Sequence, residues 1–542
     1  MEAMLIHYMA PIMFASLVIF LLLGYPVAFS LAANGLIFGL LGIELGLFRP
    51  DFLQALPERV YGIMNNDVLL AIPFFTFMGL ILERSGMAED LLDTIGQLFG
   101  TVRGGLAYAV VFVGALLAAT TGVVAASVIS MGLISLPIML RYGYDRRVAA
   151  GVIAASGTLA QIIPPSLVLI VMADQLGRSV GDMYQGAFIP GLGLAALYAL
   201  WVFVISIVRP HHMPALPLTA ITVRESTGKA GYASLVVVLG IAVAAAYGLA
   251  AYEILHPIWA SALVGGVAYA AALADKYLRL HVLSLLARQV VIVMMPPLAL
   301  IFLVLGTIFL GIATPTEGGA MGSAGALILA FVNRRLDLRL LKQAMDTTAK
   351  LSSFVMFILV GSTVFSLVFR GVNGDLWVES LLISLPGGQI GFLIVVNALA
   401  FVLAFFLDFF ELAFIIVPLL GPVAAKLGID LIWFGVLLGV NMQTSFMHPP
   451  FGYALFYLRS VAPKEEYTDR VTGKRLAPLT TGQIYWGVIP FVIIQVIMVG
   501  IVIAFPSMVT GVLDKGTGIN PNTIHFEAPL PPDDGGPPPD FR

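Results

Sequence analysis

The segment Ala155-Ser-Gly-Thr-Leu-Ala-Gln-Ile-Ile-Pro-Pro-Ser-Leu-Val-Leu169 decides the fold class, because two consecutive prolines interrupt a long apolar run there. The run covers about 147–174, which is long enough to cross a bilayer. Proline cannot donate to the helical ladder and clashes with the preceding turn, so Pro164-Pro165 predicts a broken helix. The break frees carbonyls at membrane depth, and these need partners.

The composition of the whole chain agrees with a membrane location. Of 542 residues, 59% are hydrophobic and 11% are charged, with a mean hydropathy of +0.99. A soluble protein has roughly a quarter of its residues charged. This excludes a soluble enzyme, a nucleic-acid-binding protein and a disordered scaffold. The absence of cysteine excludes disulfides and Cys-ligated metal sites. Since barrel-type alternation is also missing, we predict an all-α polytopic membrane protein in contact with membrane lipid.

Sixteen apolar segments are candidate membrane helices. They cover about 8–24, 26–47, 67–83, 104–120, 122–140, 147–174, 186–208, 233–252, 257–274, 289–311, 318–333, 351–369, 389–407, 409–425, 431–458 and 483–506. The pairs within 104–140 and 389–425 have almost no linker, so each is either two spans or one re-entrant hairpin.

The distribution of basic residues favours re-entrant hairpins. With about 12 transmembrane helices plus two hairpins, 21 of the 28 Lys and Arg residues fall on one side and 7 on the other. Because cytoplasmic loops carry the excess of Lys and Arg, we expect both termini outside. The first span is expected to act as an uncleaved anchor.

Five positions of the first half recur in the second half with one offset of 285 residues. They are Pro137, Gly143, Asp145, Pro164 and Pro165, matched by Pro422, Gly428, Asp430, Pro449 and Pro450. The loop after the first hairpin is rich in arginine and its equivalent carries only Lys426, so equivalent loops should lie on opposite sides. An inverted repeat of this kind is typical of secondary transporters, whose substrate site lies near the midplane at broken helices.

The repeat suggests a division of the chain into four parts. They are 1–208 (first repeat, hairpin about 104–140, broken helix about 147–174), 209–288 (two linking spans), 289–506 (second repeat, hairpin about 389–425, broken helix about 431–458) and 507–542 (a proline-rich disordered tail).

The two breaks and the two hairpin tips carry the candidate site. Freed carbonyls and nearby hydroxyls suit a hard cation such as Na⁺, and half-helix N-termini suit an anionic substrate group. The alternative is a structural kink in which Ser, Thr and packing satisfy the carbonyls. The candidate Na⁺-binding residues are Thr120, Thr121, Gly122, Gly157, Thr158, Ala160, Ile163, Pro164, Leu407, Asp408, Glu411, Gln443, Thr444 and Met447. The candidate substrate-binding residues are Thr121, Ser156, Asn441 and Thr444.

Three ionisable residues lie inside apolar runs. Unpaired burial of Asp408 and Glu411 is expensive, so they either pair, bind a cation or reach water at the hairpin tip. His448 is a candidate proton site or a hydrogen-bonded structural histidine. Ser445 lies three residues before His448, the spacing of a nucleophile–base pair on one helix face, but a third catalytic group is missing.

Motifs of soluble enzymes are missing from the sequence. It contains no P-loop, nucleophile elbow or H-E-x-x-H zinc motif. We therefore expect no enzyme activity and no cofactor. Thr314-Pro-Thr-Glu317 has the spacing of a capping box that opens a helix near residue 316.

With these residues in view, the chain resembles the large membrane subunit of the tripartite ATP-independent periplasmic (TRAP) transporters over nearly its whole length. The motifs that carry the resemblance are Gly24-Tyr-Pro-Val-Ala-Phe29, Ile72-Pro-Phe-Phe-Thr-Phe-Met-Gly79, Arg103-Gly-Gly-Leu-Ala107, Ala149-Ala-Gly151, Gly157-Thr-Leu159, Ile163-Pro-Pro-Ser166, Ala313-Thr-Pro-Thr-Glu317 and Pro449-Pro-Phe-Gly452. The family's first hairpin tip commonly reads Ser-Gly-Ser, and Thr usually precedes its second Pro-Pro. Here these positions are Thr121-Gly122-Val123 and His448.

The resemblance implies an elevator-type carrier in the bacterial inner membrane that imports small organic acid anions (carboxylates) with Na⁺. It also implies two partners, a small four-helix membrane subunit and a periplasmic substrate-binding protein. Two alternatives stay open at this point: a stand-alone Na⁺- or H⁺-coupled anion carrier of similar hairpin architecture, and a passive channel, against which the two broken helices argue.

Overall fold

A computed structural model describes residues 6–217, 220, 223, 231–469 and 471–513, except for the side chains of Leu22 and Thr121. Its first part contains α2 (Met9–Leu22), α3 (Val27–Glu44), η1 (Phe52–Gln54), α4 (Ala55–Met64), η2 (Asp67–Leu70), α5 (Ala71–Arg84), α6 (Met87–Phe99), α7 (Gly105–Thr121), α8 (Val124–Arg141), α9 (Arg146–Thr158), η3 (Leu159–Gln161), α10 (Leu167–Leu176), α11 (Val180–Val208) and η4 (Pro210–His212). The linking helices are α12 (Tyr232–Ala251) and α13 (Pro257–Leu278).

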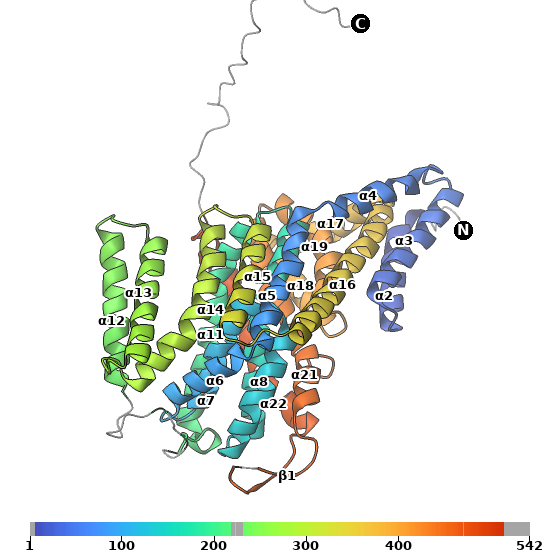
Figure 1. Ribbon diagram of the computed structural model, residues 1–542. Coiled ribbons are helices and arrows are strands. Elements are labelled where there is room, and N and C mark those ends of the chain that lie inside the picture. The colour runs from blue at the N-terminus through green and yellow to red at the C-terminus, as the bar shows by residue number, and fades with distance from the viewer. Residues whose placement is uncertain (1–5, 218–219, 221–222, 224–230, 470, 514–542) are drawn as a thin grey trace, which may run out of the picture.

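The rest of the chain repeats much of this order. It contains α14 (Leu285–Phe309), α15 (Pro315–Val332), α16 (Leu338–Gly371), α17 (Gly374–Ile383), α18 (Gly388–Leu403), α19 (Phe409–Lys426), α20 (Leu431–Met442), η6 (Gln443–Phe446), α21 (Tyr453–Val461), β1 (Tyr467–Thr468), β2 (Arg475–Leu476), α22 (Thr481–Ala504) and α23 (Ser507–Thr510). The short antiparallel pair β1–β2 lies between α21 and α22 (Figure 1). The predicted all-α polytopic architecture is confirmed.

Fewer helices than the predicted twelve have the length and hydropathy of a membrane span. Among the described residues nine qualify, or up to eleven if each of two bent pairs is one span. The broken segments fall short because each half is brief: α10 has 10 residues and α20 has 12. Two amphipathic helices, α4 and α6, were not predicted, because an apolar window does not detect them.

Element boundaries recur with the offset found in the sequence. The helix α19 begins and ends 285 residues after α8, and α20 begins 285 residues after α9. The hairpin helices α7 and α8 lie in the lower half of Figure 1, whereas α18 and α19 lie in its upper half. The two segments therefore carry the same order of elements at opposite ends of the molecule.

The matched positions make the same local interactions in both segments. Asp145 caps α9 by accepting from two backbone N–H groups, and Asp430 caps α20 in the same way. Gly143 and Gly428 both have positive φ, at +84° and +73°, in the turns before these caps. Glycine adopts this conformation without steric cost, so the recurring residues are those that turn the chain and restart a helix.

The core is built around the broken helices. In α9 every residue from Ala149 to Thr158 is buried, and in α20 every residue from Trp433 to Met442. By contrast, α12 and α13 are mostly exposed on the outside of the protein. A helix that is apolar all round is buried in protein or faces lipid, so the linking pair is expected to face lipid.

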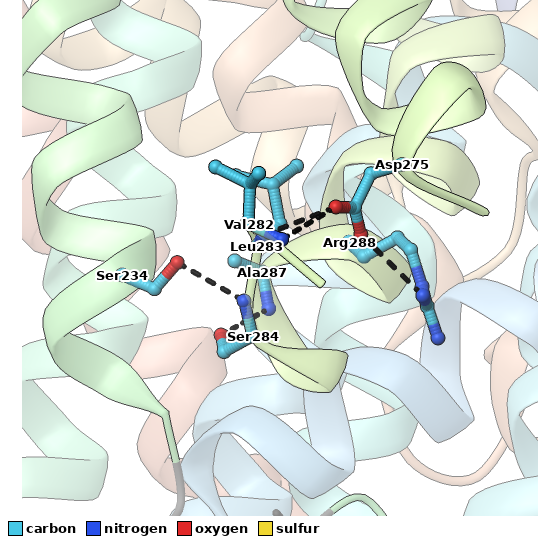
Figure 2. Close-up of polar contacts among 7 residues, drawn as sticks. All are labelled: Ser234, Asp275, Val282, Leu283, Ser284, Ala287 and Arg288. Carbon is cyan, nitrogen blue, oxygen red and sulfur yellow. Dashed lines mark hydrogen bonds and ion pairs between the residues drawn. The ribbon is translucent and has the colours of Figure 1, made fainter. Parts of the chain in front are cut away.

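The turn from α13 to α14 joins the linking pair to the second part (Figure 2). Asp275 accepts from the backbone N–H of Val282 at 2.8 Å and lies 3.4 Å from Arg288 Nη1. Ser284 caps α14, and its N–H donates to Ser234 Oγ on α12 at 3.1 Å. These bonds satisfy the turn's backbone groups and orient α14 against α12.

At the C-terminal end, the chain stays ordered beyond the predicted start of the tail. Ser507–Thr510 form α23, and Val509 is fully buried beside α11 and α20. The apolar side chain explains this difference from the prediction. The remainder of the predicted tail, 514–542, lies outside the described residues.

Candidate functional site

The first helix break brings hairpin one against the proline pair. After α9 the chain forms η3 and then an irregular stretch that contains the cis Pro164–Pro165 bond. Gly122 follows the last residue of α7 with a φ of +58°, and a Cβ placed there would lie 3.5 Å from the Pro165 carbonyl oxygen. The hairpin tip and the break are therefore neighbours, as an ion site shared between them requires.

Hydroxyl groups satisfy part of the freed backbone at this break. Thr158 Oγ1 donates to the Ala155 carbonyl at 2.8 Å, and Ser166 Oγ donates to the Gln161 carbonyl at 2.5 Å. Thr120 Oγ1 likewise donates to the Leu117 carbonyl at 2.9 Å. The structural-kink alternative thus accounts for some of the carbonyls, while the hydroxyl oxygens retain acceptor capacity.

The second break has the same form with different side chains. After α20 the chain forms η6, and the cis Pro449–Pro450 bond follows. Thr444 Oγ1 donates to the Asn441 carbonyl at 2.7 Å. Asn441 Nδ2 donates to the Asn397 carbonyl at 2.7 Å, which ties the break to α18 of hairpin two. Asn397 was missed in the sequence, although an amide inside the apolar run 389–407 was a signal for it.

At the tip of hairpin two, the two carboxylates form a capping box. Asp408 Oδ1 accepts from the Glu411 N–H and Glu411 Oε2 accepts from the Asp408 N–H, both at 2.8 Å. Both residues are half-buried, and Glu411 also lines a cavity of about 650 Å³ next to α3 and α16. The carboxylates thus start α19, and each has a second oxygen outside the capping box. The other predicted capping box, at Thr314 and Glu317, is present too.

His448 is buried between aromatic rings of hairpin two. Its ring stacks on Phe405 with centroids 4.1 Å apart and meets Phe401 edge-on at 4.5 Å. Within the described chain, no hydrogen bond joins His448 to Ser445, and Ser445 Oγ has no partner. The nucleophile–base pair that a hydrolase needs is therefore not formed, because the proline break removes the regular helix that would align the two side chains.

The two breaks contact each other directly. Gln443 Nε2 on the second break donates to Thr158 Oγ1 on the first at 3.1 Å. Met447 Sδ lies 4.0 Å from the same hydroxyl. Thr158 and Gln443 are 285 residues apart, which is the repeat offset. When a two-fold axis relates two halves of a protein, only residues next to the axis contact the equivalent residue of the other half. This hydrogen bond therefore places the axis between the two breaks.

Three buried oxygen atoms of this region lack a partner among the described residues. They are Ser156 Oγ, Gln443 Oε1 and Ser445 Oγ, on residues that are at most 4% exposed. In the described part of the chain, no group of three His, Cys, Asp or Glu residues is placed to hold a metal ion. Hydroxyl, amide and carbonyl oxygens are ligands that suit a hard cation such as Na⁺.

The remaining candidate residues lie in the same region. Gly157, Ala160, Ile163 and Pro164 are buried at the first break, and Leu407 is buried at the second tip. A Cβ on Gly157 would meet Val128 Cγ2 at 2.3 Å, so this glycine permits the close approach of α8. The backbone of Thr121 ends α7, but its side chain lies outside the described part.

Comparisons with known proteins agree with this architecture. The family described as "Tripartite ATP-independent periplasmic transporter, DctM component" matches residues 14–286 and 258–508. The C4-dicarboxylate TRAP transporter large permease protein DctM of Pseudomonas aeruginosa is 28% identical over 85% of this chain and 91% of its own.

Two further proteins are similar to the chain. The isethionate TRAP transporter permease protein DctMQ of Oleidesulfovibrio alaskensis is 24% identical over 83% of this chain, which spans 60% of the length of DctMQ. A crystal structure of the YdaH transporter of Alcanivorax borkumensis has a TM-score of 0.50 and 14% identity, covering 85% of this chain and 90% of that one, and shows the fold alone. The chain belongs to the DctM family of TRAP transporter large permease subunits, multi-pass membrane proteins that are transporters rather than enzymes.

Proposed function

We propose that this protein catalyses Na⁺-coupled import of small organic acid anions across the bacterial inner membrane as the large subunit of a TRAP system. The contact between the two proline breaks carries the proposal, because it gathers oxygen atoms of both segments in one buried place. One ion site is formed by hairpin one and the first break, and the other by hairpin two and the second break.

The substrate class follows from the site and from the relatives. The permeases named for C4-dicarboxylate and isethionate both serve small organic anions. In this chain the substrate lies between the hairpin tips, near Thr121, Ser156, Asn441 and Thr444. The half-helices that follow the breaks point positive dipole ends toward this region, which favours an anionic group.

The partners are a small four-helix membrane subunit and a periplasmic binding protein. The family description calls the transporter tripartite, and DctMQ is a fused permease. The transport domain, with both hairpins and both breaks, moves as an elevator against the remaining helices. Both termini face the periplasm. Because the chain has no cysteine, single cysteines introduced into loops test this topology by labelling from either side.

The test of coupling is uptake into proteoliposomes that contain all three components. An inward Na⁺ gradient should drive accumulation of the anion that the partner binding protein carries, and replacement of Na⁺ by K⁺ should abolish it. If uptake persists without Na⁺ and instead needs a pH gradient, the ion assignment is wrong, and Asp408, Glu411 and His448 become the proton candidates. Uptake without the binding protein would favour the stand-alone carrier.

A further inference from the structure

The hydrogen bond between Thr158 and Gln443 has a defined polarity. The single hydroxyl proton of Thr158 points to the Ala155 carbonyl, 2.8 Å away, so its oxygen accepts from Gln443 Nε2. The bond fixes the amide of Gln443 with its nitrogen toward the first break. The amide oxygen Oε1 then faces away, where no donor meets it within the described chain.

Burying an amide oxygen without a hydrogen-bond partner costs free energy. Both breaks determine this cost here, since the second supplies the amide and the first supplies the hydroxyl that orients it. Gln443 and Thr158 are each 0% exposed, so water from the surface does not reach them directly. A cation at the second break would satisfy Oε1 and hold the amide in place. The orientation of the amide in turn places Gln443 Nε2, which donates to the Thr158 hydroxyl oxygen.

The ends of two half-helices also meet at this bond. Thr158 is the last residue of α9, and Gln443 follows the last residue of α20. A helix C-terminus carries roughly half a negative charge, and two such ends in proximity repel each other. A cation bound at either break offsets this repulsion and so favours the close approach of the two ends that the Thr158–Gln443 bond requires.

We propose that the Thr158–Gln443 hydrogen bond couples the two ion sites, so that a cation at one break raises the affinity of the other. This inference rests on the proposed function. Each residue acts on the opposite break as a positioning residue, and Gln443 Oε1 also faces the ion of its own break. A cation that orders one break thereby holds the bond, and the bond holds the Thr158 hydroxyl against the Ala155 carbonyl of the other break.

The test is a double-mutant cycle on the Na⁺ dependence of uptake by the complete system. The variants are Thr158→Val, Gln443→Leu and the double variant. The wild type should show a Hill coefficient of about 2 for Na⁺, and each single variant about 1, since the coefficient approaches the number of coupled sites. In each single variant, the half-saturating Na⁺ concentration should be about fivefold or more above that of the wild type. The double variant should be no worse than the worse single variant, because both changes remove one bond.

Matched variants separate coupling from general damage. Asn34→Leu removes a similar amide–hydroxyl bond, partly buried, to Ser16 Oγ at 2.6 Å between α2 and α3, and should leave the Hill coefficient at about 2. Thr158→Ser keeps the hydroxyl and should keep the cooperativity. If Gln443→Leu does not fold, Gln443→Asn, whose amide is one methylene too short to make the bond, takes its place.

Two results would overturn the proposal and differ in meaning. If the single variants keep the wild-type Hill coefficient, or if their effects add in the double variant, the bond does not couple the sites, and the proposed function stands. If wild-type uptake does not depend on Na⁺ at all, the proposed function and the coupling fall together.

Discussion

The helices α9 and α22 cross at two glycines, and replacing either one should destabilise the protein measurably. A Cβ on Gly151 would lie 2.0 Å from the Gly487 carbonyl oxygen, and a Cβ on Gly487 would lie 2.2 Å from the Arg147 carbonyl oxygen. Carbon and oxygen atoms need roughly 3.5 Å, so the clashing atoms must move apart by about 1.5 Å. Overpacking of this kind costs about 1–3 kcal/mol.

The measurement compares Gly151→Ala with Gly500→Ala. Gly500 lies on α22, and a Cβ added there would have nothing within 4 Å, so its substitution gains helix propensity without a clash. Both variants gain up to about 1 kcal/mol from propensity, and the difference between them isolates the overpacking. We expect unfolding midpoints in detergent to fall for Gly151→Ala and to hold or rise for Gly500→Ala. Equal midpoints would refute the close crossing of α9 and α22.

Three further predictions follow from single contacts. Asp408→Ala should cost about 1 kcal/mol of stability and Asp408→Asn much less, because Asn caps helices as well as Asp. Thermal unfolding measures both, and an equal loss in the two variants would show that the charge matters instead. Ser130→Ala removes the hydroxyl that donates to half-buried Glu83 at 3.0 Å and should cost about 1–3 kcal/mol of stability, which Glu83→Gln should partly restore. Additive losses in the double variant would contradict this. The hydrogen bond from the Thr472 hydroxyl lowers the pKa of Asp469 from its ordinary value of 3.8 to about 2. The free energy of unfolding should therefore fall as the pH drops from 3.8 to 2, and Asp469→Asn should remove that dependence.

The breaks were predictable from the sequence because proline lacks an N–H wherever it stands and a matched pair of prolines recurs at the repeat offset. Proline alone does not decide the outcome, since α14 continues through Pro296-Pro297. The caps at Asp145 and Asp430 are similarly local, since each side chain bonds N–H groups two and three residues ahead. Such features need no knowledge of tertiary structure.

Contacts between distant segments were not predictable in this way. Asn397 gains its role only when α18 lies against the second break, 44 residues further on. The sequence left pairing, cation binding and solvation open for the carboxylates at the second tip, and the structure shows that they cap α19. The sequence showed two acidic residues three apart in an apolar run, but the N–H groups that they bond become unpaired only once a helix starts there.

The repeat itself explains why its centre was the hardest part to recognise. Positions far from the axis make equivalent local contacts in each half, so Gly143 and Gly428 keep one residue type. A position beside the axis faces its own equivalent, so its two side chains must fit each other as well as their own halves. Thr158 accepts and Gln443 donates, so the two residue types here share the two roles. Thr158 and Gln443 thus differ in residue type because they contact each other across the two halves. A comparison of residue identity alone would count this position as a loss of the repeat.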